Sequence, residues 1–312
     1  LTPTESQPRV VGLMYVMLLV GTIVSALVFG ALLQDFSPAR LVQVIQAAAL
    51  STLVLNTVAL WKQETRNPGR FARPRRDPTF REAWSTFVEG EGARRRLLAI
   101  GIGTMAFGMQ DVLLEPYGGQ VLGMAVGDTT WLTATLASGG LLGFSVASIV
   151  LGRGADPARM SMSGAWIGLP AFAAVLLAAT TQSIVLFFGG ALLIGLGAGV
   201  FSHGTLTLTM QRAPHDQAGL ALGAWGAVQA TAAGTAVALG GILRDIFATL
   251  AQRGVFGDSW AQPTTGYAFV YGLELLLLVL TLVVMRPLVR GRCPVRHAPA
   301  VGGVDNVPAG VR

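Results

Sequence analysis

Polar side chains that could bind a ligand gather within one short, otherwise apolar stretch of the sequence. Asp111 and Glu115 are four residues apart, which places their carboxyl groups on one side of a helix. Pro116 should end this helix, because proline removes a backbone hydrogen bond, so that Gly118 and Gly119 form a turn. The complete set of candidate binding residues in this stretch is Gln110, Asp111, Glu115, Tyr117, Gly118, Gly119 and Gln120.

Two interpretations fit this polar stretch. In the first, its amide, carboxyl and phenol groups form a platform that binds a polar head group or exchanges a proton. An oxygen of Glu115 or Gln110 could then also serve as the axial ligand to the magnesium of a chlorin ring. In the second, the stretch is only a helix end with solvated acids, or it forms ion pairs and hydrogen bonds with neighbouring helices.

His203 is a further candidate because it lies within a long apolar run. A neutral imidazole can ligate the magnesium of a chlorin, and Gly195, Gly199 and Gly204 would leave room for a flat macrocycle. The alternative is a hydrogen bond from His203 to a neighbouring helix. Five more polar residues in apolar runs are expected mostly to bond between helices: Gln43, Gln46, Asn56, Gln229 and Glu274.

Residue types that support other chemistry are scarce. Lys62 is the single lysine and no glycine precedes it, so a phosphate-binding loop and a nucleotide-driven pump are not expected. Cys293 is the single cysteine, which excludes an intrachain disulfide. The three histidines lack the spacing of a zinc or iron site. Nucleotide-driven pumping and a standard zinc or iron site are therefore not expected.

The composition is that of a membrane protein. Of 312 residues, 52% are hydrophobic and only 12% are charged, whereas about 25% are charged in an average soluble domain. We therefore expect an all-α integral membrane protein with eight transmembrane helices, each of roughly 20 residues. The apolar runs are residues 10–33, 41–61, 97–114, 131–151, 163–179, 184–210, 219–243 and 268–285.

The distribution of arginine and lysine predicts the orientation. Nineteen of these residues lie on one side of the predicted membrane and three, Arg40, Arg244 and Arg253, lie on the other. Because basic loops stay in the cytoplasm, both ends of the chain and its longest loop should be cytoplasmic.

The first two apolar runs can be aligned with the last two. Residues 2–35 match residues 213–245 weakly, which suggests a duplicated arrangement of six plus six helices whose first four helices are missing here. The alternative is that two unrelated helices rich in glycine and alanine align by composition. Parallel six-helix halves are the arrangement of major facilitator proteins, and the loop at 152–156 contains the G-x-x-x-D core of their cytoplasmic signature.

The predicted cytoplasmic loop should contain a short amphipathic helix that lies on the lipid surface. Its apolar face would carry Phe80, Trp84 and Phe87, and Arg75 and Arg76 just before it would contact anionic lipid. A nucleic-acid partner is not expected, because the membrane orientation already explains the basic residues.

These patterns divide the chain into five parts. They are a cytoplasmic segment at 1–9, two helices of an N-terminal bundle at 10–61, a basic linker at 62–96, a C-terminal six-helix bundle at 97–285 and a disordered cytoplasmic tail at 286–312.

Residues 108–124, which read GMQDVLLEPYGGQVLGM, strongly resemble the signature of the PucC/LhaA family, the bacteriochlorophyll delivery branch of the major facilitator superfamily in purple phototrophic bacteria. Residues 5–31 and 35–64 are similar to this family as well. The resemblance implies an assembly factor in the photosynthetic inner membrane that is not an enzyme. It would bind bacteriochlorophyll, in transit or stably, and hand it to light-harvesting α and β polypeptides.

Two other functions remain open from the sequence. A proton-coupled secondary transporter of a small amphipathic solute would use Asp111, Glu115 or Glu274 as proton carriers. An inert membrane scaffold is the third possibility. Most acidic residues lie near helix ends, however, and glycines and apolar residues fill the middle of the helices, which favours an apolar ligand.

Overall fold

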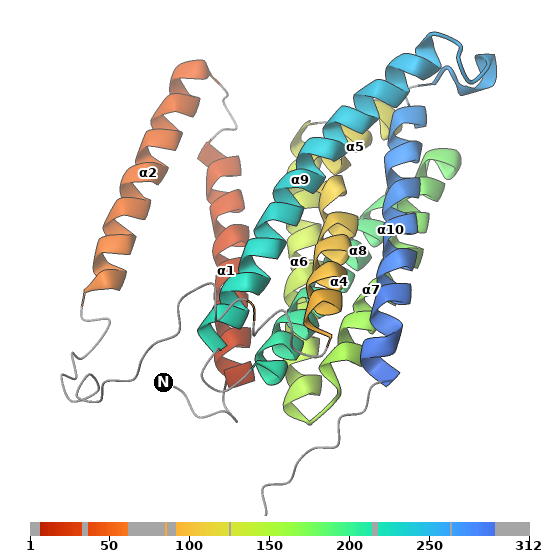
Figure 1. Cartoon of the computed structure of the whole chain (residues 1–312). Helices are drawn as coiled ribbons and strands as arrows, with labels where there is room; N and C mark the ends of the chain where they lie inside the picture. Colours follow the sequence, from red (N-terminus) through yellow and green to blue (C-terminus); the bar gives the residue numbers. More distant parts are fainter. Residues whose placement is uncertain are drawn as a thin grey trace, which may run out of the picture.

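The computed structural model describes residues 7–32, 37–61, 85, 92–124, 126–213, 218–262 and 264–290, and their regular structure is entirely helical (Figure 1). The helices are α1 Gln7–Leu32, α2 Pro38–Leu60, α4 Ala93–Gly108, η2 Met109–Val112, α5 Leu114–Leu122, α6 Val126–Gly152, α7 Pro157–Thr181, α8 Ile184–Arg212, α9 Ala218–Gln252, η3 Asp258–Trp260 and α10 Thr264–Arg290.

The all-α membrane class is confirmed, but the predicted number of eight spans is not. Among the described residues six helices are long and apolar enough to cross a membrane, or up to seven if α4, η2 and α5 are counted as one bent span. Helix α1 is 26 residues long, and within it Val16–Ser25 is counted as a shorter apolar helix.

Helix α8 lies at the centre of the bundle, where glycines allow the closest helix contacts. It packs mainly against α6 and α7. A side chain at Gly195 would overlap the carbonyl oxygen of Leu136 on α6, and one at Gly197 would lie 2.9 Å from the carbonyl oxygen of Gly164 on α7. The glycine spacing in these three helices therefore serves packing, as in other membrane bundles. By contrast, a side chain at Gly219 or Gly223 would meet nothing within 4 Å.

Helix α10 joins the other side of the bundle, with α4, α7 and α9 as its main neighbours. Helix α9 continues to Gln252, nine residues beyond the end of the predicted run. The start of α7 is fixed by Asp156, whose side chain accepts a hydrogen bond from the Ala158 N–H at 2.8 Å. This aspartate of the G-x-x-x-D motif is thus a helix cap.

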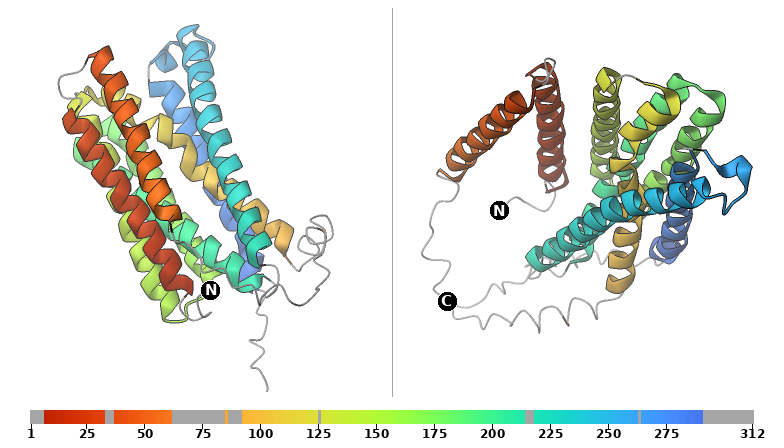
Figure 2. Two further views of the ribbon diagram at one scale, coloured as in Figure 1. Left: turned by 90° about the vertical axis from the view of Figure 1, so that its left-hand side faces the viewer. Right: turned by 90° about the horizontal axis from the view of Figure 1, so that it is seen from above.

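Helices α1 and α2 lie at one edge of the molecule (Figure 2). Helix α1 packs mainly against α6. In α2 none of the span Val42–Leu60 is buried. Its amides Gln43, Gln46 and Asn56 are exposed, so no helix of the described part of the chain covers them, contrary to the expectation of hydrogen bonds between helices.

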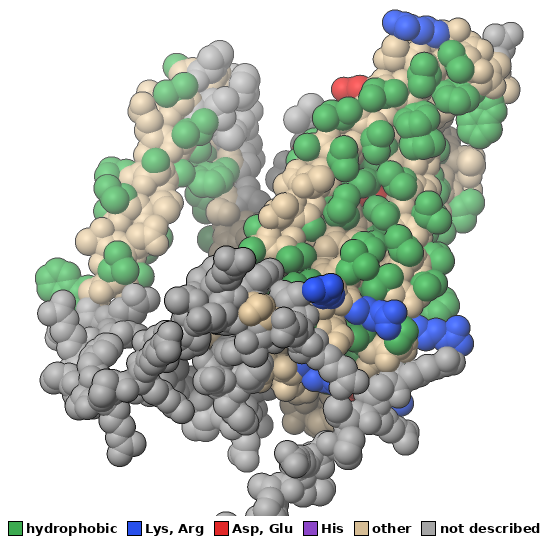
Figure 3. Space-filling view, viewed as in Figure 1, with side chains coloured by type: hydrophobic (Ala, Val, Ile, Leu, Met, Phe, Trp, Pro, Cys, Tyr) green, Lys and Arg blue, Asp and Glu red, His purple; other side chains and the backbone are tan. Residues whose placement is uncertain are grey.

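The surface of the bundle is apolar along the helices and basic at one end. Figure 3 shows hydrophobic side chains along α9, with most of the visible arginines at the lower end of the view. The residues predicted to contact lipid, Phe80, Trp84, Phe87, Arg75 and Arg76, lie outside the described residues. Residues 286–290, predicted as the start of a disordered tail, belong to α10, and the rest of the predicted tail lies outside the described residues.

Candidate ligand-binding site

The polar stretch lies at a break between two helices. The α-helix ends at Gly108, four residues of 3₁₀ helix follow in η2, and α5 continues at an angle of 46°. Because a 3₁₀ helix turns more tightly than an α-helix, the four-residue spacing of Asp111 and Glu115 no longer places their side chains on one helical face.

The prediction that Pro116 ends a helix is wrong. Pro116 lies in the first turn of α5, where the backbone N–H groups have no partner within the helix and proline is therefore tolerated. Gly118 and Gly119 lie inside α5 and form no turn. The helix ends instead at Gly123, whose φ of 65° is left-handed and favours glycine.

Beside this break lies a cavity of about 450 Å³, lined by residues of α1, α4, η2, α6, α8 and α9. This volume is in the range of small-molecule sites. Its walls are mainly apolar and include Phe107, Phe144, Ile194 and Phe201. The polar residues of its lining are Thr22, Thr104, Gln110, Asp111, Thr133 and Ser202.

Two buried polar atoms of the cavity lining have no hydrogen-bond partner among the described residues, Gln110 Oε1 and Thr104 Oγ1. The Gln110 side chain is only 2% exposed, and its Nε2 group donates to Asp111 Oδ1 and to the Phe107 carbonyl oxygen. These two hydrogen bonds from Nε2 fix the orientation of the Gln110 amide group, and its oxygen is left without a hydrogen-bond partner among the described residues. Because leaving such an acceptor unpaired costs about 1–3 kcal/mol, the cavity favours a ligand that donates a hydrogen bond or offers a coordination position.

The other predicted residues of this stretch contact different helices and do not converge on the cavity. Glu115 is exposed, and its Oε1 accepts a hydrogen bond of 2.6 Å from Thr133 Oγ1 on α6. Tyr117 is buried and donates to the Val175 carbonyl oxygen on α7 at 2.9 Å. Its ring also packs edge-on against Tyr271. Glu115 and Tyr117 therefore hold α5 against its neighbours.

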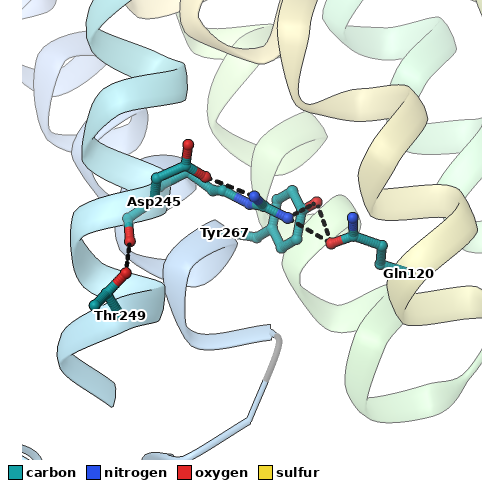
Figure 4. Close-up of polar contacts among 5 residues, drawn as sticks. Gln120, Asp245, Thr249 and Tyr267 are labelled. Carbon is teal, nitrogen blue, oxygen red and sulfur yellow. Dashed lines mark hydrogen bonds and ion pairs between the residues drawn. The ribbon is translucent and has the colours of Figure 1, made fainter. Parts of the chain in front are cut away.

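Gln120 belongs to a polar cluster that joins α5, α9 and α10 (Figure 4). Its Oε1 accepts hydrogen bonds from Arg244 Nη2 and from the Tyr267 hydroxyl, at 2.5 and 2.9 Å. Arg244 also donates to Asp245 Oδ1 at 2.6 Å, and its guanidinium carbon lies 4.6 Å from the centre of the Tyr267 ring. Sequence reasoning missed this cluster, although Arg244 is one of only three basic residues predicted on its side of the membrane.

Replacing Arg244 with lysine should weaken this cluster although the charge is kept. An ammonium group has no planar fork with which to reach Asp245, Gln120 and Tyr267 together. We expect a loss of about 1–2 kcal/mol in the free energy of unfolding, measured as a lower melting temperature in detergent. Arg253→Lys, an exposed change past the end of α9, is the control, and equal melting of the two variants would contradict the role of the cluster.

His203 is completely buried in α8 and lies edge-on to Phe144, with ring centres 5.6 Å apart. Neither ring nitrogen has a hydrogen-bond partner among the described residues. A side chain at Gly204 would lie 2.5 Å from Ser161 Oγ. Gly204 therefore allows α7 to pack closely against α8, which leaves no room for a macrocycle on that side. Phe144, next to His203, is part of the cavity wall.

Taken together, the helices define a polytopic α-helical membrane protein with a largely apolar cavity. The chain belongs to the PUCC protein family, whose model matches residues 1–293. The sequence-based resemblance to PucC proteins is thereby confirmed.

Curated relatives agree with this assignment. The chain is 49% identical over 297 residues to Protein PucC of Cereibacter sphaeroides, covering 95% of this chain and 64% of that protein. It is 59% identical over 249 residues to Protein PucC of Rhodovulum sulfidophilum, covering 78% and 55%. A more distant relative, 25% identical over 300 residues and covering 93% and 66%, is the bacteriochlorophyll synthase 44.5 kDa chain of Rhodobacter capsulatus. The chain thus spans about 55–64% of the length of these PucC proteins, and no solved structure matches it significantly.

Proposed function

We propose that this chain acts in an assembly factor that delivers bacteriochlorophyll to light-harvesting α and β polypeptides, without catalysing a reaction. The observation that carries the proposal is the cavity at the helix break, with apolar walls and the unpaired amide oxygen of Gln110. A chlorin combines a flat apolar face with a magnesium that takes an axial oxygen or nitrogen ligand. Family membership, and the word bacteriochlorophyll in the name of one relative, add support.

Within this proposal Gln110 is the preferred axial ligand among the three candidates. Gln110 lines the cavity, and its oxygen is buried without a hydrogen-bond partner among the described residues. Glu115 Oε1 is engaged by Thr133, and His203 is enclosed behind Phe144. Asp111 would accept a hydrogen bond from the ligand or from a water molecule, while Tyr117, Gly118, Gly119 and Gln120 would hold α5 in position.

We also propose that the chain lies in the photosynthetic inner membrane in a major facilitator-like arrangement, with both ends in the cytoplasm. The bias of nineteen basic residues against three supports this orientation. The arginines at one end of the bundle in Figure 3 agree with it. Light-harvesting polypeptides and lipid would be the partners in this membrane.

Pigment bound to the purified protein tests the proposal. After mild solubilisation from pigmented cells, the wild-type chain should carry bacteriochlorophyll absorbance. Gln110→Leu should lower the pigment-to-protein ratio about fivefold, the equivalent of the ~1 kcal/mol that a polar contact contributes. Gln46→Leu, which removes an exposed amide on α2, should leave the ratio unchanged.

The alternatives give different results in the same strains. Deleting the protein should reduce assembled antenna complexes while free bacteriochlorophyll is still made. If antenna levels stay normal and uptake or export of a solute is lost, the transporter is the better explanation. If neither changes, the chain is a scaffold and the proposed delivery role fails.

A further inference from the structure

A second group of acidic and phenolic side chains lies on the other side of the helix break from the cavity. Glu274 on α10 is completely buried, and neither of its carboxyl oxygens has a hydrogen-bond partner among the described residues. Its polar neighbours are the Gln110 backbone, the Asp111 carboxyl group and the hydroxyl of Tyr271. The Tyr271 hydroxyl is also buried and unpartnered within the described part of the chain.

Among the described residues, the helices packed against α10 carry their basic side chains outside long uncharged stretches, and Arg244 on α9 is already bonded to Asp245, Gln120 and Tyr267. The elements packed against α10 include α4, α7, α9, η2 and α5. Residues 97–108, 160–181 and 218–243 of the three long helices contain no charged or titratable side chain. The titratable groups that face this region are Asp111 on η2, Tyr117 on α5, and Tyr267 and Tyr271 on α10.

A carboxylate in this environment would be unstable. Burial of an unpaired ion costs several kcal/mol even after the protein relaxes, and the nearby Asp111 carboxylate would add repulsion. A neutral carboxylic acid avoids both costs. Because of this cost, a buried acidic residue without a counter-ion in a membrane helix is a candidate functional residue.

Asp111 connects this acid to the cavity. Its side chain is exposed and forms part of the cavity lining. Gln110 bridges the two sides of the break, because its backbone adjoins Glu274 while its side-chain amide donates to Asp111. Asp111 is therefore a titratable residue of the cavity lining that also neighbours Glu274.

We propose that Glu274 is a proton-binding site that exchanges its proton with the cavity through Asp111. The acid proton leaves the Glu274 carboxyl group and binds to the Asp111 carboxylate, so the pair holds one proton and one negative charge throughout. Ligand binding beside Asp111 is then linked to proton binding by the protein. This inference does not depend on which ligand the cavity takes.

Infrared spectroscopy of the purified full chain, free of pigment, tests the site directly. A buried carboxylic acid gives a carbonyl stretching band separate from those of carboxylates and amides, and the band shifts in D₂O. We expect this band in the wild-type protein at neutral pH and its loss in Glu274→Gln, which keeps the shape of the side chain. Glu115→Gln, a change at an exposed acid, should leave it in place.

The route through Asp111 has its own readout. In Asp111→Asn the band should remain, but its shift after transfer to D₂O should slow by about a hundredfold, a typical contribution of a positioned acid–base group to proton transfer. An acid band that is identical in wild type and Glu274→Gln would overturn the proton site. An unchanged exchange rate in Asp111→Asn would overturn the route. Neither measurement involves pigment, so both remain valid if the proposed delivery function fails.

Discussion

A tryptophan at position 233 should deprive the cavity of its ligand while the helix bundle stays folded. Ala233 is half-buried on α9 and lines the cavity. The indole of Ala233→Trp would therefore occupy cavity volume and would not displace packed side chains. In the proposed function, pigment carried by the purified protein should fall below detection and antenna assembly should fail. The measurement is the pigment-to-protein ratio after mild solubilisation.

The control for this prediction lies on the same helix. Ala238 is exposed and is not among the residues that line the cavity. Ala238→Trp should therefore keep its pigment. If Ala233→Trp accumulates normally and binds as much pigment as Ala238→Trp, the pigment site lies elsewhere and the function proposed for the cavity is wrong.

The second large effect concerns the contact between α6 and α8. In Gly195→Ala the new methyl group would overlap the Leu136 carbonyl oxygen, and relief requires the two backbones to separate. Such overpacking costs about 1–3 kcal/mol and at times more. We expect a lower melting temperature in detergent and less protein in the membrane.

Gly189 on the same helix provides the matched comparison. A methyl group there would have no atom within 4 Å. Alanine is the better helix former by roughly 0.5–1 kcal/mol, so Gly189→Ala should be neutral or slightly stabilising. Equal destabilisation by the two changes would show that the close contact of α6 and α8 is not what makes Gly195 important.

The helices themselves follow from local sequence information. Apolar runs long enough to span a bilayer predict most helix ends to within a few residues, and several of these helices begin at a side-chain cap, such as Asp156 and Ser183. The family could also be identified from the sequence, because the motif at residues 108–124 is distinctive. These features need no knowledge of which helices are neighbours.

The helix break could not be derived in this way. Proline is compatible both with the end of one helix and with the first turn of the next. Pro116 alone therefore does not show whether a helix ends or begins at this position. The position of η2 depends on a long-range contact: a side chain at Gly240 on α9 would lie 2.8 Å from the Met109 carbonyl oxygen. A rule based on neighbouring residues in the sequence cannot predict this close approach of α9 to η2.

The candidate site was predicted only in part for the same reason. Sequence spacing singled out Gln110 and Asp111, which do line the cavity. It also suggested that Glu115, Tyr117 and Gln120 converge with them, which required an unbroken helix. The partner of Gln120, Arg244, is 124 residues away in the chain, and such a pairing is set by the packing of three helices.

The way α1 is attached has a mechanical consequence. One wall of the cavity includes Thr22 of α1, and α1 packs mainly against α6. The bundle core, where α8 meets α6 and α7, is held by close backbone contacts and is therefore stiff. Because Thr22 of α1 borders the cavity, a small tilt of α1 about α6 would change the width of the cavity while the glycine contacts between α8, α6 and α7 stay intact.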